Sequence, residues 1–284
     1  MNAMHALPIA PILIGSLLAC VWLNVRRTLL ALEAALAQAR EVARSTQHLI
    51  LRPLSRDLAG THVCTRYHCA GSESAIGGDL YDIAVTPYGL RVLVGDVRGH
   101  GLEALRLTAA TIAAFRELAY TAPDLPTLVT HLDKRLAPEL DAEDFVTAVF
   151  AEFAPGEVRL VNCGHPAPLR AGQRVEPLEP REPVPPLGLH PDPRQYRFLL
   201  QPGDRLLLHT DGLTDARSAD GTPFPLLTEV ADALREPLPD DALDSLYDRV
   251  VAHAGVRRTD DLALVLCQPA EAPARIMTPT RRPT

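Results

Sequence analysis

The sequence has little of what a structural zinc site or a disulfide framework requires. Its five cysteines contain no C-x-x-C pair; they are Cys20, Cys64, Cys69, Cys163 and Cys267. An odd number of cysteines without paired spacing is typical of a chain kept in a reducing compartment. Cys64, His68 and Cys69 lie near one another along the chain, and we interpret them as strand residues rather than as zinc ligands.

Features of two other protein classes are missing as well. The formal net charge is −7 and there is no basic stripe, which argues against a nucleic-acid partner and leaves room for bound cations. There is no Walker loop, and residues 210–215 lack the Asp-x-Asp pair that an aspartyl-phosphate enzyme would need. With 284 residues, 47% of them hydrophobic, the chain has the size of one catalytic domain and a short extra segment.

The extra segment is N-terminal. Residues 7–25 are almost all apolar and uncharged, which suits a membrane-spanning helix, and Arg26 and Arg27 follow directly. The positive-inside rule therefore predicts a single-pass cell-membrane anchor at residues 1–27, with the catalytic domain in the cytoplasm. A signal peptide, or a lipoprotein signal at Cys20, would have a basic start, which is missing here. A helix that packs on a partner is the remaining alternative.

Residues 28–52 are predicted to form a helical linker. No glycine or proline occurs from 28 to 50, and apolar residues recur at alternating three- and four-residue steps, which is a heptad pattern. This pattern predicts either a coiled coil in a homodimer or a helix that packs on its own catalytic domain. Pro53 is expected to end the helix.

Residues 53–268 alternate between strand and helix patterns and are predicted to be the catalytic domain. Runs rich in β-formers predict strands at 90–97, 145–153, 158–162, 204–210 and 261–267. Apolar residues at helical spacing predict helices at 102–119 and 242–254. Hairpin-like strands interrupted by helices favour an α+β fold. The proline-rich residues 177–193 predict a surface loop, and residues 269–284 a disordered tail.

Four aspartates stand at positions suited to ligand binding. Asp79 follows two glycines, Asp96 and Asp211 each close an apolar strand, and Asp260 precedes one. Taken alone, an Asp-Gly pair is more typical of a turn, and Gly-Gly-Asp is also compatible with a β-bulge. Were the four carboxylates to converge, their repulsion would be relieved by two divalent cations, and oxygen ligands suit Mn²⁺ or Mg²⁺. Two such ions polarise a phosphoryl oxygen and supply a hydroxide nucleophile.

The order of these motifs resembles the SpoIIE/RsbU-type branch of the PPM metal-dependent serine/threonine phosphatases. The resemblance covers roughly residues 51–268. The matching segments are GGDLYD (77–82), GDVRGHG (95–101), FVT (145–147), NCGHP (162–166), PGD (202–204), TDGLTD (210–215) and TDD (259–261). Asp215 stands where that family usually has glutamate, His209 where tyrosine is common and Pro225 where glycine is frequent, and none of these is a proposed ligand.

The resemblance implies an αββα sandwich of two antiparallel sheets flanked by helices, with two Mn²⁺ or Mg²⁺ ions at one end. It implies that Asp96 bridges both ions and that the Val97 carbonyl is a further ligand. Asp79 would hold one ion, and Asp211 and Asp260 the other. A water between the ions would attack phosphorus without a phospho-enzyme intermediate.

The remaining motif residues have two interpretations each. We expect a turn rather than a catalytic role at His165, loop positioning rather than proton transfer at His100, and either site support or a strand start at Asp261. Asp82 is expected to face solvent or support the site, and Arg98 either pairs with a substrate phosphate or stays solvated.

The predicted function is dephosphorylation of serine or threonine on a bacterial regulatory protein. The family's substrates are often anti-anti-sigma proteins of the STAS type, which makes such a protein the expected partner. Alternatives are a non-catalytic membrane-bound pseudophosphatase that binds a signalling partner, and a metal phosphohydrolase acting on a small phosphate ester. A pseudophosphatase would have lost an aspartate, and all four are present.

Overall fold

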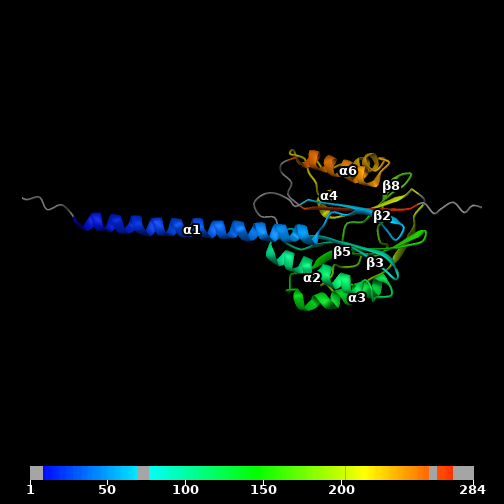
Figure 1. Ribbon diagram of the computed structural model, residues 1–284, viewed down its shortest axis with the longest axis horizontal. Coiled ribbons are helices and arrows are strands. Elements are labelled where there is room, and N and C mark those ends of the chain that lie inside the picture. Colours follow the sequence, from blue (N-terminus) through cyan, green and yellow to red (C-terminus); the bar gives the residue numbers. More distant parts are fainter. Residues whose placement is uncertain (1–8, 69–76, 202, 256–260, 271–284) are drawn as a thin grey trace, which may run out of the picture. The chain divides into compact units, whose positions relative to one another are not determined.

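From residue 9 to residue 50, the predicted anchor and linker form one continuous helix. The computed structural model describes residues 9–68, 77–201, 203–255 and 261–270, in two compact units, residues 1–46 and 47–284 (Figure 1). Helix α1 (Ile9–Ile50) is unbroken because its only proline, Pro11, lies in the first turn, where no backbone donor is needed. It ends before Pro53, as predicted. The predicted tail lies outside the described residues from 271 onward.

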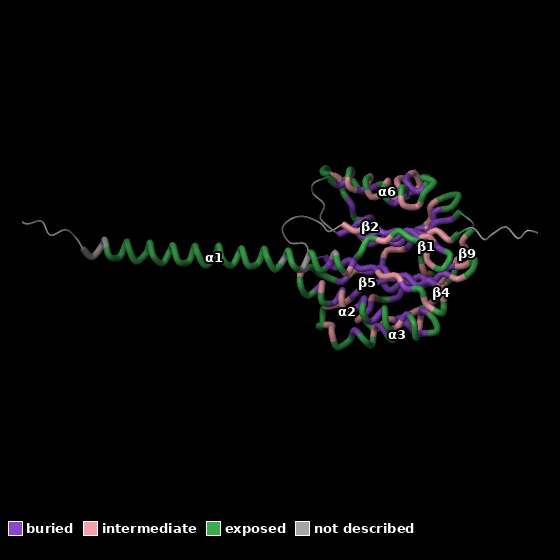
Figure 2. Tube along the Cα trace, in the orientation of Figure 1, coloured by how far each residue is buried: buried purple, intermediate pink, exposed green. Residues whose placement is uncertain are grey.

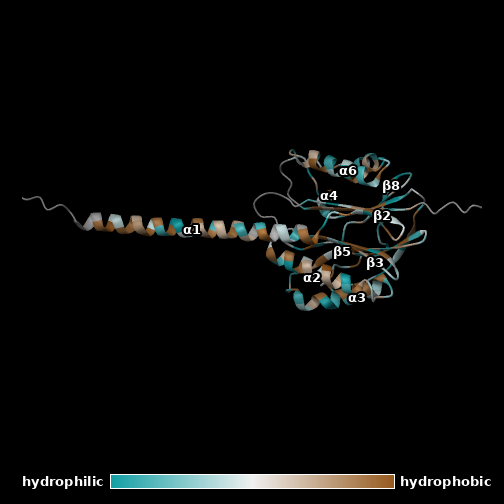
Figure 3. Ribbon diagram, in the orientation of Figure 1, coloured by the Kyte–Doolittle hydropathy of each residue, from teal (hydrophilic) through white to brown (hydrophobic). Residues whose placement is uncertain are grey.

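Helix α1 is apolar enough to cross a membrane by length and composition. The candidate span is Leu13–Ala39, with mean hydropathy 1.4 and no residue buried within the structure (Figures 2 and 3). This span lies further along the chain than the predicted residues 7–25. Residues 7 and 8 lie outside the described residues. A signal sequence near an N-terminus would pass the same test. The span is therefore a candidate.

The second unit contains two antiparallel sheets. The first has the order β1-β2-β11-β10-β7-β8 and the second β3-β4-β5-β6-β9. The strands of the first sheet are β1 (Ser55–Leu58), β2 (Thr61–His68), β11 (Leu262–Pro269), β10 (Arg205–His209), β7 (Leu169–Ala171) and β8 (Val175–Pro177). Those of the second are β3 (Asp79–Thr86), β4 (Gly89–Val97), β5 (Val146–Ala154), β6 (Glu157–Cys163) and β9 (Tyr196–Leu199).

Helices cover the outer face of each sheet (Figure 1). On the second sheet lie α2 (Leu102–Leu118) and α3 (Leu125–Leu136), followed by the 3-10 turn η1 (Ala137–Glu139). On the first sheet lie α6 (Pro239–Ala254) and, against it, α5 (Leu226–Ala233), while α4 (Asp211–Thr214) is a single turn after β10. The α+β prediction is confirmed, with the four layers ordered helix, sheet, sheet, helix.

The layered arrangement explains why the central strands are apolar without alternation. In β10, Leu206 and Leu208 belong to the core between the sheets, whereas Leu207 packs in the core beneath α5 and α6. Both faces of the strand are thus buried, and each position needs an apolar side chain. Figure 2 shows the same continuous burial along the central strands of both sheets.

A buried ion pair joins the second sheet to the end of α2. Arg91 donates from Nε and Nη2 to Glu152 Oε2 at 2.8 and 2.6 Å, and both side chains are almost fully buried. Its Nη1 donates to the carbonyls of Ala119 and Ala122 at 2.7 and 2.8 Å. Every side of the guanidinium is therefore satisfied, which burial of a charge requires.

The structure of the proline-rich segment differs from its prediction as a surface loop. The proline-rich residues 177–193 are not simply a surface loop, because Leu178, Val184 and Leu187 are buried in the core. Leu187 also exchanges two backbone hydrogen bonds with Val146, of 3.1 and 2.9 Å. The composition correctly predicted that this segment has little regular structure. It did not reveal that the segment covers the end of the core beside β5.

Candidate active site

Asp79 and Asp96 are brought together by the hairpin of β3 and β4. The two residues are directly opposite in the antiparallel register that the turn at residues 87–88 fixes. Opposed residues project from the same face of a sheet, with Cβ atoms roughly 5 Å apart. The predicted pairing of these two motifs thus follows from local strand register.

Asp211 and Asp261 come from the other sheet. Asp211 lies just after β10 and Asp261 just before β11, and the two strands are antiparallel neighbours, so these ends coincide. The backbones meet closely there, since a Cβ on Gly212 would lie 1.8 Å from the carbonyl oxygen of Asp261. The predicted ligand Asp260 lies outside the described residues.

Asp79 lies where the two pairs converge, because Gly77, two residues before it, packs directly against Asp261. Asp79 is fully buried, and burial raises its pKa well above the ordinary value. The negative charges of Asp96, Asp261 and Asp211 raise that pKa further, against a hydrogen bond of 2.7 Å from Thr210 Oγ1 that lowers it. Carboxylates from both sheets therefore act on one buried carboxylate.

Such a cluster fits hard divalent cations. Four acidic side chains near one buried point are unfavourable as anions unless cations balance them. The donors are all oxygens, which suits Mg²⁺ or Mn²⁺ better than zinc. The Val97 carbonyl lies in the same place, because a Cβ on Gly78 would be 2.1 Å from that oxygen and 2.5 Å from Asp96 Oδ1.

The two glycines before Asp79 are required by this close packing. A Cβ on Gly77 would lie 0.9 Å from Asp261 Oδ2, and Gly78 would clash as described above. The Gly78 carbonyl accepts hydrogen bonds from Val97 N at 3.0 Å and Thr108 Oγ1 at 3.3 Å. Glycine thus allows the segment leading into β3 to lie directly against the acidic residues.

Comparison with known proteins identifies the family of this chain. The model of the family "Stage II sporulation protein E (SpoIIE)" matches residues 86–269, well over half of the chain. The chain belongs to the SpoIIE family. Membership of the SpoIIE family is what the order of the motifs in the sequence predicted.

Solved structures share the fold at low sequence identity. The RsbU and RsbW domains of Rv1364c from Mycobacterium tuberculosis match with a TM-score of 0.62 and 24% identity, over 78% of this chain and 62% of that one. The phosphatase domain and regulatory fragment of SpoIIE from Bacillus subtilis match at 0.59 and 15%, over 76% and 64%. The catalytic domain of the phosphatase PstP, in complex with two manganese ions, matches at 0.57 and 18%, over 74% and 99%. The match to this chain thus covers less than two thirds of the length of the Rv1364c and SpoIIE structures.

His165, predicted to mark a turn, is a buried link between the sheets of this SpoIIE-family chain. Its Nδ1 accepts from Thr147 Oγ1 at 2.9 Å, and its Nε2 donates to the carbonyl of His209 at 3.0 Å. Asn162 holds the backbone of His165 through two hydrogen bonds of 2.8 Å. Burial, with a smaller effect of His209, lowers the pKa of His165 to about 3, so the ring is neutral.

The link is adjacent to the acidic cluster on both sides. Thr147 is paired with Asp96 across β4 and β5, and Thr210, the residue after His209, donates to Asp79. His165 therefore links Thr147, the strand neighbour of Asp96, to the end of β10, whose Thr210 donates to Asp79. Sequence motifs pointed to His165, but no local signal indicated the role of Thr210.

The other motif residues lie around the site in ordinary surface contacts. Asp82 accepts from Arg116 Nε at 2.9 Å, and the exposed Arg98 pairs with Glu143 at 3.2 Å. His100 is exposed in the loop before α2. Asp261, by contrast, is buried and is part of the acidic cluster, which favours site support over a simple strand start.

A residue that the sequence did not single out contacts the site from α1. Gln47, in the last turn of the helix, donates from Nε2 to the Gly77 carbonyl at 3.0 Å and is almost fully buried. Both residues belong to the second unit. The end of the linker helix thus touches the segment that leads into Asp79.

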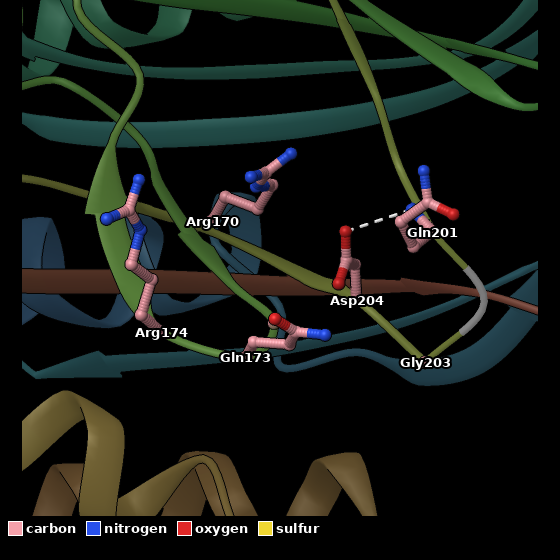
Figure 4. A pocket seen from close by; sticks show the side chains of 7 residues that line it. Arg170, Gln173, Arg174, Gln201, Gly203 and Asp204 are labelled. Atoms are coloured by element: carbon pink, nitrogen blue, oxygen red, sulfur yellow. Dashed lines mark hydrogen bonds between the residues drawn. The ribbon is translucent and has the colours of Figure 1, made fainter.

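An open pocket at the opposite end of β10 is not the candidate site (Figure 4). It is lined by residues of β7, of the β7–β8 turn and of the loop before β10, among them Arg170, Arg174 and Asp204. Both arginines pair with Glu176, and Asp204 accepts from the Gln201 backbone at 2.9 Å. None of the predicted ligands lines it, and its cations are already paired.

Proposed function

We propose that this chain is a metal-dependent phosphatase that hydrolyses phosphoserine or phosphothreonine on a regulatory protein. The observation that carries the proposal is the convergence of Asp96, Asp211 and Asp261 on the buried Asp79. The residues that would hold two Mn²⁺ or Mg²⁺ ions are Asp79, Asp96, Asp211, Asp260 and the carbonyl of Val97. When bound, the ions supply an activated water and stabilise charge on the phosphoryl oxygens.

The protein's own residues would orient and hold this site. Thr210 donates to one oxygen of Asp79 and so directs the other oxygen away from itself. Gly77 and Gly78 allow the backbone to approach the carboxylates without a side chain between them. Burial of Asp79 keeps bulk water from screening its charge, which strengthens its interaction with a cation.

The substrate and location form the finer part of the proposal. A phosphorylated STAS-type anti-anti-sigma protein is the proposed partner, and its support is family membership together with a structural neighbour that joins RsbU and RsbW domains. The candidate span in α1 supports a single-pass membrane anchor with a cytoplasmic catalytic domain. Exposed Leu29, Leu32 and Leu36 support pairing of two such helices.

Chelation and substitution test the catalytic proposal together. The full chain in detergent should release no phosphate from a phosphoserine peptide after chelation, and it should recover with Mn²⁺ or Mg²⁺. Asp96→Asn should lower turnover by at least about 100-fold, a typical loss when a group that stabilises transition-state charge is removed. Asp82→Asn, which removes a charge paired with Arg116, is the control and should stay within a few-fold.

The proposal fails if the metal-free protein, with its metal content measured as nil, retains full activity. It also fails if Asp96→Asn binds both ions and turns over normally. A correctly folded, metal-loaded protein without activity on any phosphopeptide would instead favour the pseudophosphatase alternative.

A further inference from the structure

A second group of metal-ligand side chains lies on the outer face of the first sheet. His62 and Cys64 are two residues apart on β2 and so share a face, and Asp240 comes from the first turn of α6 above them. One ring nitrogen of His62, the Cys64 sulfur and a carboxylate oxygen of Asp240 all lie within 4.8 Å of one another. Two elements far apart in sequence thus bring together nitrogen, sulfur and oxygen donors.

This group is separate from the acidic cluster. In the register of β2 with β11, His62 is opposite Gln268, whereas the acidic end of the sheet is marked by Leu262 opposite His68. The group therefore lies at the other end of β2, and it faces α6 rather than the second sheet. None of its members is a proposed ligand of the phosphatase ions.

The histidine of this group is already oriented as a ligand would be. Its Nδ1 lies 2.8 Å from Asp57 Oδ1, on the neighbouring strand β1, and its Nε2 lies 2.9 Å from Asp240 Oδ2. Metal-binding histidines commonly give their second nitrogen to a carboxylate, which fixes the ring and the tautomer. The Cys64 thiol is fully buried, and its hydrogen bond to the Leu266 carbonyl is long, at 3.9 Å.

We propose that His62 Nε2, Cys64 Sγ and Asp240 bind one borderline transition-metal ion, for which Zn²⁺ is the expected ion. Imidazole and thiolate donors select such ions, whereas Mg²⁺ and Mn²⁺ prefer oxygen alone. Asp57 is the carboxylate that orients His62. Because the His62 and Asp240 side chains are 26% and 32% exposed, a water can complete the tetrahedral set.

Charge and protons balance in this binding step. Without metal, both ring nitrogens of His62 face carboxylates, which requires an imidazolium, and the Cys64 thiol carries its proton. When the dication binds, the Nε2 proton and the thiol proton leave to solvent and the metal–nitrogen and metal–sulfur bonds form. The net charge of the group is unchanged, so zinc replaces two protons.

The ion would fasten α6 to β2. Two contacts beside it already do so without metal, since Arg66 pairs with Asp244 and Tyr247 Oη contacts His68 Nδ1 at 2.7 Å. The helix is thus expected to remain in place in the metal-free protein, with zinc adding to its stability. The rival arrangement is an imidazolium held permanently between two aspartates, and experiment separates the two.

Cobalt substitution is the decisive experiment. The full chain in detergent is stripped with chelator, then titrated with Co²⁺ and, separately, with Zn²⁺. A thiolate ligand gives a sulfur-to-cobalt charge-transfer band that the all-oxygen phosphatase site cannot give. We expect this band in the wild type, its loss in Cys64→Ser and its retention in Cys163→Ser, which removes a buried cysteine outside the group. Zn²⁺ should abolish the band by competition.

Affinity measurements complete the test. Asp57→Asn should weaken Zn²⁺ binding by about 10-fold, the effect typical of losing a ligand-orienting carboxylate. If Cys64→Ser fails to fold, His62→Gln, at a partly exposed position, serves in its place. The proposal is overturned if the wild type gives no thiolate band, or if the band survives in Cys64→Ser or His62→Gln. These readouts do not depend on phosphatase activity.

Discussion

At the scale of single residues, His165 has the most consequential contacts outside the acidic cluster. We expect His165→Phe, which makes neither hydrogen bond, to remove the side-chain donor to the His209 carbonyl and to leave Thr147 Oγ1 only its longer contact, of 3.4 Å, with the Asp96 carbonyl. Unsatisfied buried groups cost ~1–3 kcal/mol each. Denaturant unfolding should therefore show a loss of about 2 kcal/mol or more, and titration should show weaker Mn²⁺ binding.

His131→Phe, at an exposed position on α3, is the control for that substitution and should change neither quantity appreciably. Retention of wild-type Mn²⁺ affinity in a folded His165→Phe protein would show that the link between the sheets does not position the ligands.

The buried pair of Arg91 and Glu152 gives a second prediction at this scale. Glu152→Gln keeps the shape but leaves a buried guanidinium without its counter-charge, which costs roughly 3–5 kcal/mol. Urea unfolding measures this loss. Glu143→Gln removes an exposed partner of Arg98 and should cost less than about 1 kcal/mol. Equal stability of the two variants would contradict the expected difference.

Site residues could be predicted where they belong to short sequence motifs. Asp79, Asp96 and Asp211 follow or precede glycines at strand ends, and the structure brings them together as the motif order implied. Their role as ligands stays a proposal, as does that of Asp260. Thr210 and Gln47 could not be found in this way, because their importance depends on which strands and helices become neighbours.

At the scale of elements, the contact of Gln47 with Gly77 joins the end of α1 to the segment before β3. Gln47→Ala removes a donor to the Gly77 carbonyl, and one such hydrogen bond contributes ~1 kcal/mol. We therefore expect Mn²⁺ affinity to fall by about fivefold, the equivalent of that free energy. Gln38→Ala, the same change at an exposed position of α1, is the control. Identical metal binding in both would make the linker a passive spacer.

The elements were predicted best where periodicity is strong. Strands β4, β5, β6, β10 and β11 and helices α2 and α6 appear within a few residues of their predicted bounds. The short strands β7 to β9 were missed because three or four residues are too few to show an alternating hydrophobic pattern. Helix α3 was missed although Asp124 caps it, accepting from Thr127 N at 2.8 Å, and Pro126 stands in its first turn.

At the scale of the whole molecule, the candidate span of α1 predicts association with a bilayer. The full chain should pellet with membranes and resist an alkaline wash, and a C-terminal reporter should be active only in the cytoplasm. Replacing Leu17 and Leu18 by arginine should release the protein, because each central charge costs ~2.5–3.5 kcal/mol on insertion. A wild-type protein that stays in the soluble fraction, or a reporter that is exported, would contradict the anchor.

The last strand that the structure describes, β11, lies inside its sheet, between β2 and β10. Before β11 inserts, β1–β2 and β10–β7–β8 have no ladder to join them, and Asp261 has no fixed position beside Gly77. Pairing over about 200 residues of sequence is slow to form, so this insertion is expected late in folding. A nascent chain that has not yet reached residue 261 therefore cannot complete the acidic cluster, because Asp261 and the strand that follows it are still to be made.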